Sequence, residues 1–503
     1  MPITDRGPLP VRLRRVLTAD PQAPALHFEG RSYPWRFLQR AVDDLDGILA
    51  AAGASDAHRI GIVLRNRPGH FAALVAVIAT GRQVITLNPH QGDVALAEDV
   101  RTLAPQVVIA APVDWAAAGI VDESRRLAVV AIETGEDERP LVPHTGGWAA
   151  APAPAERGEV AVLMQTSGTT GRPKRIELGY DQLTASLEAS GTPVRQEHVQ
   201  LRVRPAILWT SLVHIGGAYF VVANVAAGLQ TALLERFDVR TWADAVRRTR
   251  PRRLSLAPAA LRMVMQSDLP SDLLDGVQWV SAGTAPLGPD EADRFTARFG
   301  VPVISTYGAT EFAGAIAGWT AELFEEFGRT KRGSTGRAFQ GVELRIVDRS
   351  TGDPLPMGEV GLLEARGAQL PGEDWVRTTD LARLDDDGFL FIHGRVDDAI
   401  NRGGFTVVPG PVEELLRSHP AVRDASVVGI PDTRLGEVPV AAVVVHDDRC
   451  ESAELQDWLG ERLARYYVPA RIKIVDELPR TPSMKISRPA VQALFAGDGQ
   501  ASA

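Results

Sequence analysis

Residues 166–174 read Thr-Ser-Gly-Thr-Thr-Gly-Arg-Pro-Lys, and the interpretation of the whole chain starts from this loop. The loop follows a short apolar run at residues 160–164 that predicts a strand, so it is expected at the carboxyl end of that strand. Its two glycines allow close approach of a ligand, and its hydroxyl and lysine side chains donate to phosphate oxygens. The Walker A spacing, Gly-x-x-x-x-Gly-Lys-[Ser/Thr], is absent. The sequence therefore indicates a phosphate-binding loop of another kind.

Lysine is rare in this chain. Of its 54 basic residues only four are lysines, namely Lys174, Lys331, Lys473 and Lys485. Lysine presents a compact point charge that the planar guanidinium of arginine does not reproduce. Because lysine nevertheless occurs in the 166–174 loop and again near the C-terminus, we expect chemistry at these positions.

Composition describes an ordinary globular protein with an acidic balance. Its 503 residues suggest roughly three folding units. The net charge of −9 argues against nucleic acid as the main partner. Cys450 is the only cysteine, which excludes an intramolecular disulfide, and residues 1–20 lack the apolar core of a secretory signal, so a cytoplasmic location is expected. Residues 205–234 carry no charge, but their polar residues and glycine pair favour a buried strand, loop and helix over a membrane span.

Between residues 59 and 133, apolar runs alternate with helical patterns, which predicts a layered α/β unit with a largely parallel sheet. A second α/β stretch follows the linker at 152–158, and residues 336–394 alternate short strands with glycine turns. Beyond Arg395 we expect a helix at 412–418, strands at 425–430, 438–445 and 471–475, and a helix at 454–465. The predicted fold class is α/β. A large N-terminal domain of layered α/β subdomains (1–395, with a β-rich subdomain at 336–395) precedes a small α+β domain (396–503).

Further motifs follow the 166–174 loop in order. They are SAGTAPL at 281–287, YGATE at 307–311, Asp380, GRVDD at 394–398, GGF at 403–405 and PRTPSMKISR at 479–488. Their shared order closely resembles the adenylate-forming superfamily of acyl-CoA synthetases, adenylation domains and luciferases. The resemblance implies that a carboxylate attacks the α-phosphate of ATP, which gives an acyl-adenylate and pyrophosphate, and that a thiol then displaces AMP. It implies ATP, Mg²⁺ and CoA as cofactors.

The resemblance also implies roles for individual residues. Lys485, Glu311, Thr166 and His214 are the expected catalytic residues, with Glu311 as the Mg²⁺ ligand and Lys485 as the lysine that meets the acyl carboxylate and the α-phosphate. The residues expected to bind the nucleotide are Thr166, Ser167, Gly168, Thr169, Thr170 and Lys174 at the phosphates, Gly283, Thr284, Ala285, Tyr307, Gly308, Ala309 and Thr310 around the adenine, Asp380 and Arg395 at the ribose, and Lys485.

Three more features follow from the same resemblance. Asp397 matches the hinge at which the small domain of relatives rotates between the two half-reactions, although Asp397 and its neighbour Asp398 are also suited to capping a following helix. Gly403 and Gly404 are expected to line a thiol tunnel. The expected acyl-pocket residues are His214, Gly216 and Phe220, and His214 is equally compatible with a core histidine.

Two positions depart from the family pattern. Thr379 replaces the glycine that usually precedes the ribose aspartate, and it would crowd a turn if the backbone there needed a positive φ. Met484 replaces the glycine before the adenylation lysine, where its thioether would narrow the site or change the position of Lys485. Neither departure removes a charged group that adenylation needs. Adenylation is therefore still expected, whereas the identity of the acceptor and of the acid is not determined.

Three functions remain from the sequence. The first is an acid–CoA ligase for a small aryl or medium-chain acid. The second is an adenylating enzyme with another acceptor, either a carrier-protein pantetheine or an amine, including nitrite activation for diazotisation. The third is a non-catalytic relative that binds a nucleotide or ligand as a sensor, against which the joint presence of Lys174, Glu311, Asp380 and Lys485 argues.

Overall fold

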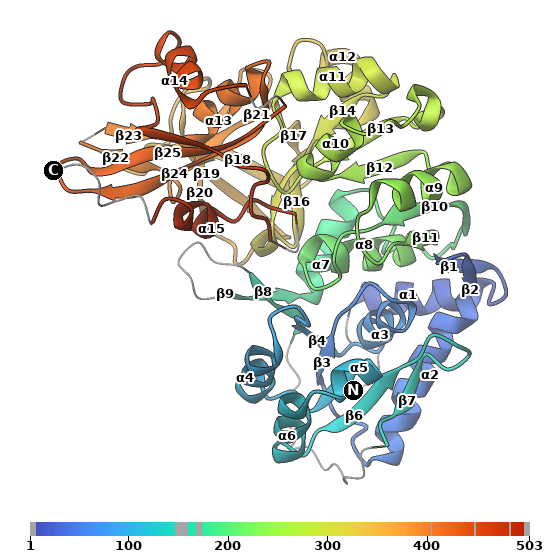
Figure 1. Ribbon diagram of the computed structural model, residues 1–503. Helices are drawn as coiled ribbons and strands as arrows, with labels where there is room; N and C mark the ends of the chain where they lie inside the picture. The colour runs from blue at the N-terminus through green and yellow to red at the C-terminus, as the bar shows by residue number, and fades with distance from the viewer. Residues whose placement is uncertain are drawn as a thin grey trace.

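The structure is a computed structural model, and it describes residues 7–145, 159–166, 174–403, 405–446, 449–481 and 484–496. Figure 1 shows an N-terminal α/β region in blue, a central α/β region in green and yellow, and a C-terminal region in orange and red beside the central one. The mixed α/β class predicted from the sequence is confirmed.

Within the described residues, the N-terminal region contains a seven-stranded sheet in the order β7-β6-β5-β3-β4-β8-β9. The inner strands from β6 to β8 are parallel, while the edge strands β7 and β9 pair antiparallel. The strands are β3 (Arg59–Val63), β4 (Gln83–Leu87), β5 (Val107–Ala110), β6 (Val130–Thr134), β7 (Leu141–Pro143), β8 (Val160–Thr166) and β9 (Lys174–Gly179). The helices are α1 (Pro8–Ala19), α2 (Trp35–Ala51), α3 (Pro68–Ala79), α4 (Asp93–Leu103), α5 (Pro112–Trp115) and α6 (Ala118–Arg126). The parallel sheet predicted for residues 59–133 is therefore confirmed.

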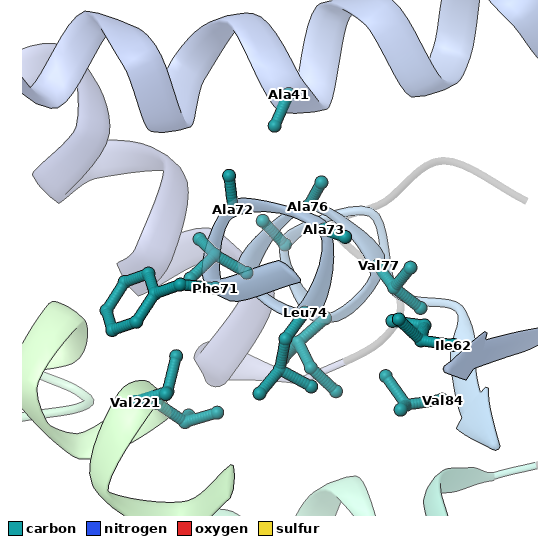
Figure 2. Close-up of a cluster of buried hydrophobic side chains, with 14 of the residues drawn as sticks. Ala41, Ile62, Phe71, Ala72, Ala73, Leu74, Ala76, Val77, Val84 and Val221 are labelled. Carbon is teal, nitrogen blue, oxygen red and sulfur yellow. The ribbon is translucent and has the colours of Figure 1, made fainter. Parts of the chain in front are cut away.

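Helix α3 lies at the centre of the largest hydrophobic core. Every one of its residues is buried, because α2 covers one side, the strands β3 and β4 another, and α8 (Ile215–Ala226) a third. Figure 2 shows Ala72 and Ala76 of α3 on the side of Ala41 of α2, Phe71 on the side of Val221 of α8, and Val77 next to Ile62 of β3. A helix that is apolar on all sides is stable only inside such a core. Packing against α3 therefore joins the N-terminal and central regions.

The central region contains two further sheets, in the orders β10-β11-β1-β2 and β12-β13-β14. Their strands are β1 (Pro24–Phe28), β2 (Arg31–Pro34), β10 (Arg202–Leu208), β11 (Leu229–Leu233), β12 (Arg253–Leu256), β13 (Trp279–Ala282) and β14 (Val303–Ser305). The helices are α7 (Tyr180–Ala189), α8, α9 (Val239–Thr249), α10 (Pro258–Met265), η2 (Ser271–Leu274) and α11 (Pro289–Phe299). Residues 205–234 contain the end of β10, a connecting loop and α8, as predicted, and they continue into the strand β11, which was not predicted. No helix in the described part of the chain is both long and apolar enough to cross a membrane.

Antiparallel sheets follow. The sheet β15-β16-β17 precedes the sheet β18-β19-β20-β21, which lies inside the segment predicted to be β-rich. The elements are β15 (Tyr307–Ala309), η3 (Thr310–Phe312), β16 (Gly314–Gly318), α12 (Ala321–Phe327), β17 (Arg337–Ala338), β18 (Val342–Val347), β19 (Gly361–Gly367), β20 (Val376–Leu384) and β21 (Leu390–Arg395).

The C-terminal region is built around the long β24–β25 hairpin. Its elements are β22 (Ile400–Arg402), β23 (Phe405–Val407), α13 (Pro409–Ser418), β24 (Val422–Asp432), β25 (Gly436–Val445), α14 (Ser452–Gly460), β26 (Arg471–Ile474) and α15 (Arg488–Ala493). Helix α13 begins three residues earlier than predicted, because proline is favourable in the first turn of a helix. The predicted helix at 454–465 was too long, since α14 ends at Gly460, a residue of low helix propensity.

Asn66 connects the N-terminal region to the segment just before α8. Its side-chain nitrogen donates to the carbonyl oxygens of Trp209 (3.2 Å), Thr210 (3.1 Å) and Leu234 (3.1 Å), and its oxygen accepts from the N–H of Leu212 (3.0 Å). Because the Asn66 side chain is buried, water cannot replace it as the hydrogen-bond partner of these backbone groups. Asn66 thereby sets the backbone that leads into α8.

We expect Asn66→Ala to lower the free energy of unfolding by about 1–3 kcal/mol, because buried backbone groups lose their hydrogen-bond partners. Denaturant titration of the purified protein measures this change. Gln278→Ala, which truncates an exposed amide side chain, serves as the control and is expected to leave the midpoint unchanged. Equal midpoints for the two variants would contradict the role of Asn66.

Candidate active site

Tyr307 and Asp380 meet at the junction of β15 and β20. The Tyr307 hydroxyl donates to Asp380 Oδ2 at 2.5 Å, and the N–H of Asp380 donates to Thr378 Oγ1 at 3.0 Å. Burial raises the pKa of Asp380, whereas the hydrogen bond from Tyr307 opposes that rise. Burial and the neighbouring Asp380 raise the pKa of Tyr307, so its hydroxyl stays protonated and acts as a donor. The carboxylate is therefore oriented by a donor that stays protonated, and its other oxygen, Oδ1, lies 3.8 Å from Nε of Arg395.

Thr379 does not crowd a turn, because it lies within strand β20 with extended backbone. Its hydroxyl accepts from Nε (3.1 Å) and Nη2 (2.6 Å) of Arg395. The Arg395 guanidinium also lies 3.8 Å from Asp380 and 3.3 Å from Asp397. The departure from glycine at position 379 thus supplies an acceptor that orients Arg395 beside the Asp380 carboxylate.

Lys485 faces the same place from the C-terminal region. Burial and the positive charge of Arg395 lower the pKa of the Lys485 ammonium, and the carboxylate of Glu311 opposes this change. Burial, Lys485 and His90 lower the pKa of His214. Lys485 is therefore electrostatically coupled to Arg395, Glu311 and His214, which belong to separate parts of the chain.

His90 was missed by the sequence analysis. It follows β4, and the parallel pairing of β4 with β8 puts the carboxyl ends of both strands at one edge of the sheet. Residues after the carboxyl ends of parallel strands tend to gather at ligand sites. The position of His90, three residues beyond the end of β4 at Leu87, was therefore the signal that could have identified it.

The phosphate-loop residues lie partly outside the described residues. Thr166 and Lys174 are register partners at the ends of β8 and β9, so the loop connects these two strands. The predicted residues Ser167, Gly168, Thr169 and Thr170 fall outside the described residues, as does Gly404.

The predicted adenine residues follow β13 and occupy β15. A Cβ at Gly283 would lie 3.0 Å from Thr306 Oγ1, and Thr284 has a φ of +72°. A Cβ at Gly308 would lie 2.3 Å from the carbonyl oxygen of Gly314, so glycine is required there by the close β15–β16 backbones. Ala285 follows in the same loop, and the chain continues from Ala309 through Thr310 into η3.

Glu311 lies in η3 with an exposed side chain. Within the described residues no group of three or more His, Cys, Asp or Glu side chains could hold a metal ion. Mg²⁺ is commonly held by one or two carboxylates together with phosphate oxygens and water. The exposed carboxylate of Glu311 fits a metal that arrives with a phosphate ligand.

The predicted acyl-pocket residues lie at the start of α8. His214 is the N-cap residue of this helix, and a Cβ at Gly216 would meet no atom within 4 Å. Phe220 is 38% exposed on the same helix. In contrast, a Cβ at Gly217 would lie 2.1 Å from the carbonyl oxygen of Ser211, so Gly217 is required for packing. The open space at Gly216 is compatible with a pocket.

The segment after Arg395 is not followed by a helix, so the helix-cap interpretation of Asp397 and Asp398 was wrong. Asp397 and Asp398 do not cap a helix, because the chain continues into strand β22, which pairs with β23 and β25. Asp397 accepts from Arg395, and Asp398 pairs with Arg488 at 3.4 Å. Gly403, with a φ of +56°, ends this stretch. The hinge and the thiol tunnel remain predictions.

Comparison with known proteins identifies the family. Residues 13–371 match the AMP-binding enzyme family, and residues 411–485 match the AMP-binding enzyme C-terminal domain. The chain is similar to 4-coumarate–CoA ligase-like 5 of Oryza sativa subsp. japonica, with 31% identity over 84% of this chain and 80% of the relative. It is 30% identical to a sulfoacetate–CoA ligase of Cupriavidus necator, over 87% of this chain and 88% of the relative.

Solved structures share the fold. ATP-bound MatB from Rhodopseudomonas palustris superposes with a TM-score of 0.82 at 22% identity, covering 96% of this chain and 98% of that one. The amide bond synthetase McbA from Marinactinospora thermotolerans superposes with a TM-score of 0.80 at 26% identity, covering 97% of this chain and all of the other (100%). The chain therefore belongs to the AMP-binding enzyme family, and it is an ATP-dependent ligase that joins an acid to a thiol and forms AMP.

Proposed function

We propose that the acid is a small aryl or medium-chain carboxylic acid and that the thiol is that of CoA. The observation that carries this proposal is that Arg395 lies beside the Tyr307–Asp380 pair and acts electrostatically on Lys485, as Glu311 does. The CoA ligases among the relatives, for 4-coumarate, sulfoacetate and 2-succinylbenzoate, support an acid–CoA ligase. The open space at Gly216 is consistent with the binding of a bulky acyl group next to α8.

In this proposal, the charged residues bind and stabilise the reacting groups. Asp380 accepts from the ribose hydroxyls, and Arg395 lies beside it. Lys485 lies where the acyl carboxylate meets the α-phosphate, because a fixed ammonium offsets negative charge that develops on the phosphate oxygens. Glu311 would hold Mg²⁺, which neutralises charge on the phosphates when it is bound. Thr166, Lys174 and the loop between them bind the β- and γ-phosphates.

Besides the thiol, an amine is a second candidate acceptor for the acyl group. The similarity to an amide bond synthetase over 97% of the chain favours it. His214 is compatible with this reaction, since its lowered pKa leaves a neutral imidazole that accepts a proton from an attacking amine or thiol. CoA remains the first candidate because the matched relatives include several CoA ligases.

Pyrophosphate release with ATP and Mg²⁺ tests the proposal across a panel of aryl and medium-chain acids. Each acid is assayed alone, with CoA, with arylamines and with a pantetheinylated carrier protein, and nitrite with an arylamine is included. An acid-dependent release with a CoA thioester product supports the proposal and identifies the acid. An amide product would identify an amine as the acceptor, and a carrier-bound product would identify a carrier protein. A triazene or diazonium product would identify nitrite, and not a carboxylic acid, as the activated substrate. Nucleotide binding without release for the whole panel contradicts the proposed acid class.

We expect Lys485→Ala to reduce adenylate formation by at least about 100-fold, because a fixed charge at the reacting phosphate is lost. ATP binding should be largely retained, since the other nucleotide contacts remain. Pyrophosphate release and isothermal titration with ATP separate the two effects. Lys473→Ala is the matched control, because Lys473 donates to the carbonyl oxygen of Leu494 at 2.9 Å within the C-terminal region. Unchanged turnover in Lys485→Ala would contradict the assigned role.

Removal of the Tyr307 hydroxyl should weaken nucleotide binding. We expect Tyr307→Phe to raise the KM for ATP about five- to tenfold with little change in kcat, because one hydrogen bond that orients Asp380 is lost in both ground and transition states. Tyr33→Phe is the control, because the Tyr33 hydroxyl is buried and has no hydrogen-bond partner among the described residues. A fall in kcat at constant KM would assign Tyr307 to the chemical step instead.

The pH dependence of adenylation should report the charge around Lys485. The protonated fraction of Lys485 falls as the pH rises through its lowered pKa, so the alkaline fall in rate should begin below the pH expected for an ordinary lysine. Arg395→Gln removes a positive neighbour, raises the pKa of Lys485 and moves this fall to higher pH. Rates at saturating ATP test this shift, with the exposed Arg349→Gln as control. An identical alkaline limb in Arg395→Gln and the unmodified protein would contradict the coupling.

A further inference from the structure

Met484, next to Lys485, has a left-handed backbone with a φ of +66°. Side chains disfavour this conformation, whereas glycine adopts it freely. Hydrogen bonds close the turn, because the N–H of Met484 donates to Thr481 O (2.9 Å) and the N–H of Thr481 donates to Lys485 O (2.8 Å). We call residues 480, 481, 484 and 485 the lysine turn. A methionine in this position therefore needs a compensating contact.

The compensating contact lies on another part of the chain. The Met484 side chain packs against a hydrophobic cluster that includes Trp209, Trp242 and Leu261. Among the described residues, every other member of this cluster and of the side chains packed on it comes from residues 207–303. Met484 is thus an apolar contact from the C-terminal region onto the central region, immediately beside Lys485.

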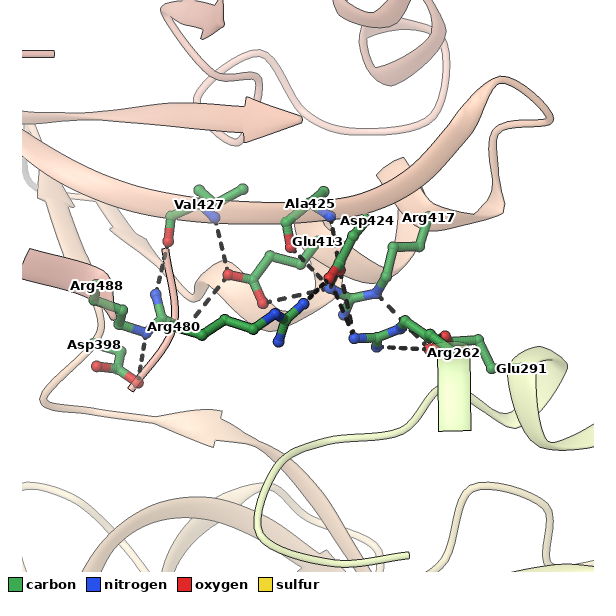
Figure 3. A network of polar contacts seen from close by, with 10 residues as sticks. All are labelled: Arg262, Glu291, Asp398, Glu413, Arg417, Asp424, Ala425, Val427, Arg480 and Arg488. Atoms are coloured by element: carbon green, nitrogen blue, oxygen red, sulfur yellow. Dashed lines mark hydrogen bonds and ion pairs between the residues drawn. The ribbon is translucent and has the colours of Figure 1, made fainter. Parts of the chain in front are cut away.

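An ion-paired bridge holds the same turn. Arg480 donates to Met484 O (3.0 Å) and to Asp424 Oδ2 (2.5 Å). Asp424 in turn lies 3.5 Å from Arg262 of α10, and Arg262 donates to Glu291 of α11 at 2.6 and 3.0 Å. Figure 3 shows Arg480 and Asp424 of the C-terminal region facing Arg262 and Glu291. The bridge therefore links the lysine turn to α10 and α11.

Burial makes this bridge specific for one arrangement of the two regions. The side chains of Asp424, Glu291 and Arg262 are only 7%, 10% and 12% exposed. A buried charge that loses its partner is strongly unfavourable, so the groups must stay paired while the two surfaces are in contact. Arg417 adds to the same contact, at 3.9 Å from Glu291 and 3.8 Å from Asp424.

We propose that Met484 is a positioning residue whose side chain docks the lysine turn onto the central region and so places Lys485 in the nucleotide site. The Arg480–Asp424–Arg262 bridge sets the orientation of the docked turn. The inference rests on the proposed role of Lys485 in adenylation. If the proposal holds, loss of the Met484 anchor affects the two half-reactions differently. Acyl-adenylate formation needs the docked lysine, whereas attack of the acceptor on the finished adenylate does not.

The first test follows Lys485 directly and needs no acid substrate. The lysines are converted to ¹³C-dimethyl-lysines, the Lys485 signal is assigned with Lys485→Arg, and its pKa is measured by NMR. Burial and the positive charge of Arg395 lower the pKa of the docked Lys485, so undocking should move this pKa upward toward its ordinary value. We expect this rise in Met484→Ala and Met484→Gly, and none in Met484→Leu, which retains an apolar side chain.

The variants are chosen so that a folding defect cannot imitate the effect. Met484→Gly removes the anchor and the left-handed strain together, whereas Met484→Ala removes only the anchor. Met357→Ala truncates an exposed methionine (59% exposed) and is the control. A pKa of Lys485 that is the same in Met484→Ala and Met484→Gly as in the unmodified protein overturns the proposal.

The second test separates the half-reactions with an acid identified by the pyrophosphate panel. Single-turnover pyrophosphate release should fall about tenfold in Met484→Ala and Met484→Gly, the factor expected when burial of one apolar side chain is lost, and recover in Met484→Leu. Consumption of preformed acyl-adenylate by the acceptor should stay within about twofold of the unmodified protein. An equal loss in both half-reactions overturns the positioning role. If Lys485 has no role in adenylation, Lys485→Ala will release pyrophosphate at an unchanged rate, which distinguishes that outcome from a failure of the Met484 proposal.

Discussion

The buried carboxylate of Asp424 is the interaction on which the assembled site depends. It lies between Arg262 of the central region and Arg480 of the turn that carries Lys485. Two guanidinium groups would not approach one another in a poorly solvated interface without an intervening negative charge. Because Asp424 supplies that charge, the C-terminal region contacts the central region in an arrangement that brings Lys485 toward Glu311 and Arg395.

The site that results contains two cations that act on each other before any ligand binds, Arg395 and Lys485, together with the carboxylates of Asp380 and Glu311. Burial and the positive charge of Arg395 lower the pKa of Lys485, and burial and Lys485 lower the pKa of His214. Such repulsion is relieved when phosphate and carboxylate oxygens enter. Donors and charges that are already in place need no rearrangement when negative charge develops on those oxygens. The same electrostatics therefore favour binding of the nucleotide and of the acid.

Sequence patterns predicted the regular elements best where the apolar period was clear, as in the strands β3 to β5 and the helix α3. They failed where a local pattern had two structural solutions. Asp397 and Asp398 looked suitable for a helix cap, yet residues 400–402 pair with β23 and β25 instead. The interpretation of Thr379 was also incomplete, because its value as an acceptor for Arg395 depends on β20 and β21 being adjacent.

The sequence by itself determined the α/β class, the family and the charged groups that adenylation requires, because short motifs and local periodicity encode them. Only the tertiary structure decided which groups meet. His90 lies near His214, the Thr379 hydroxyl faces Arg395, and Met484 packs on a cluster formed by residues 207–303. Contacts of this kind join side chains far apart in the chain, and their partners are set by strand order and by the packing of whole regions. No local pattern around a residue specifies such a partner.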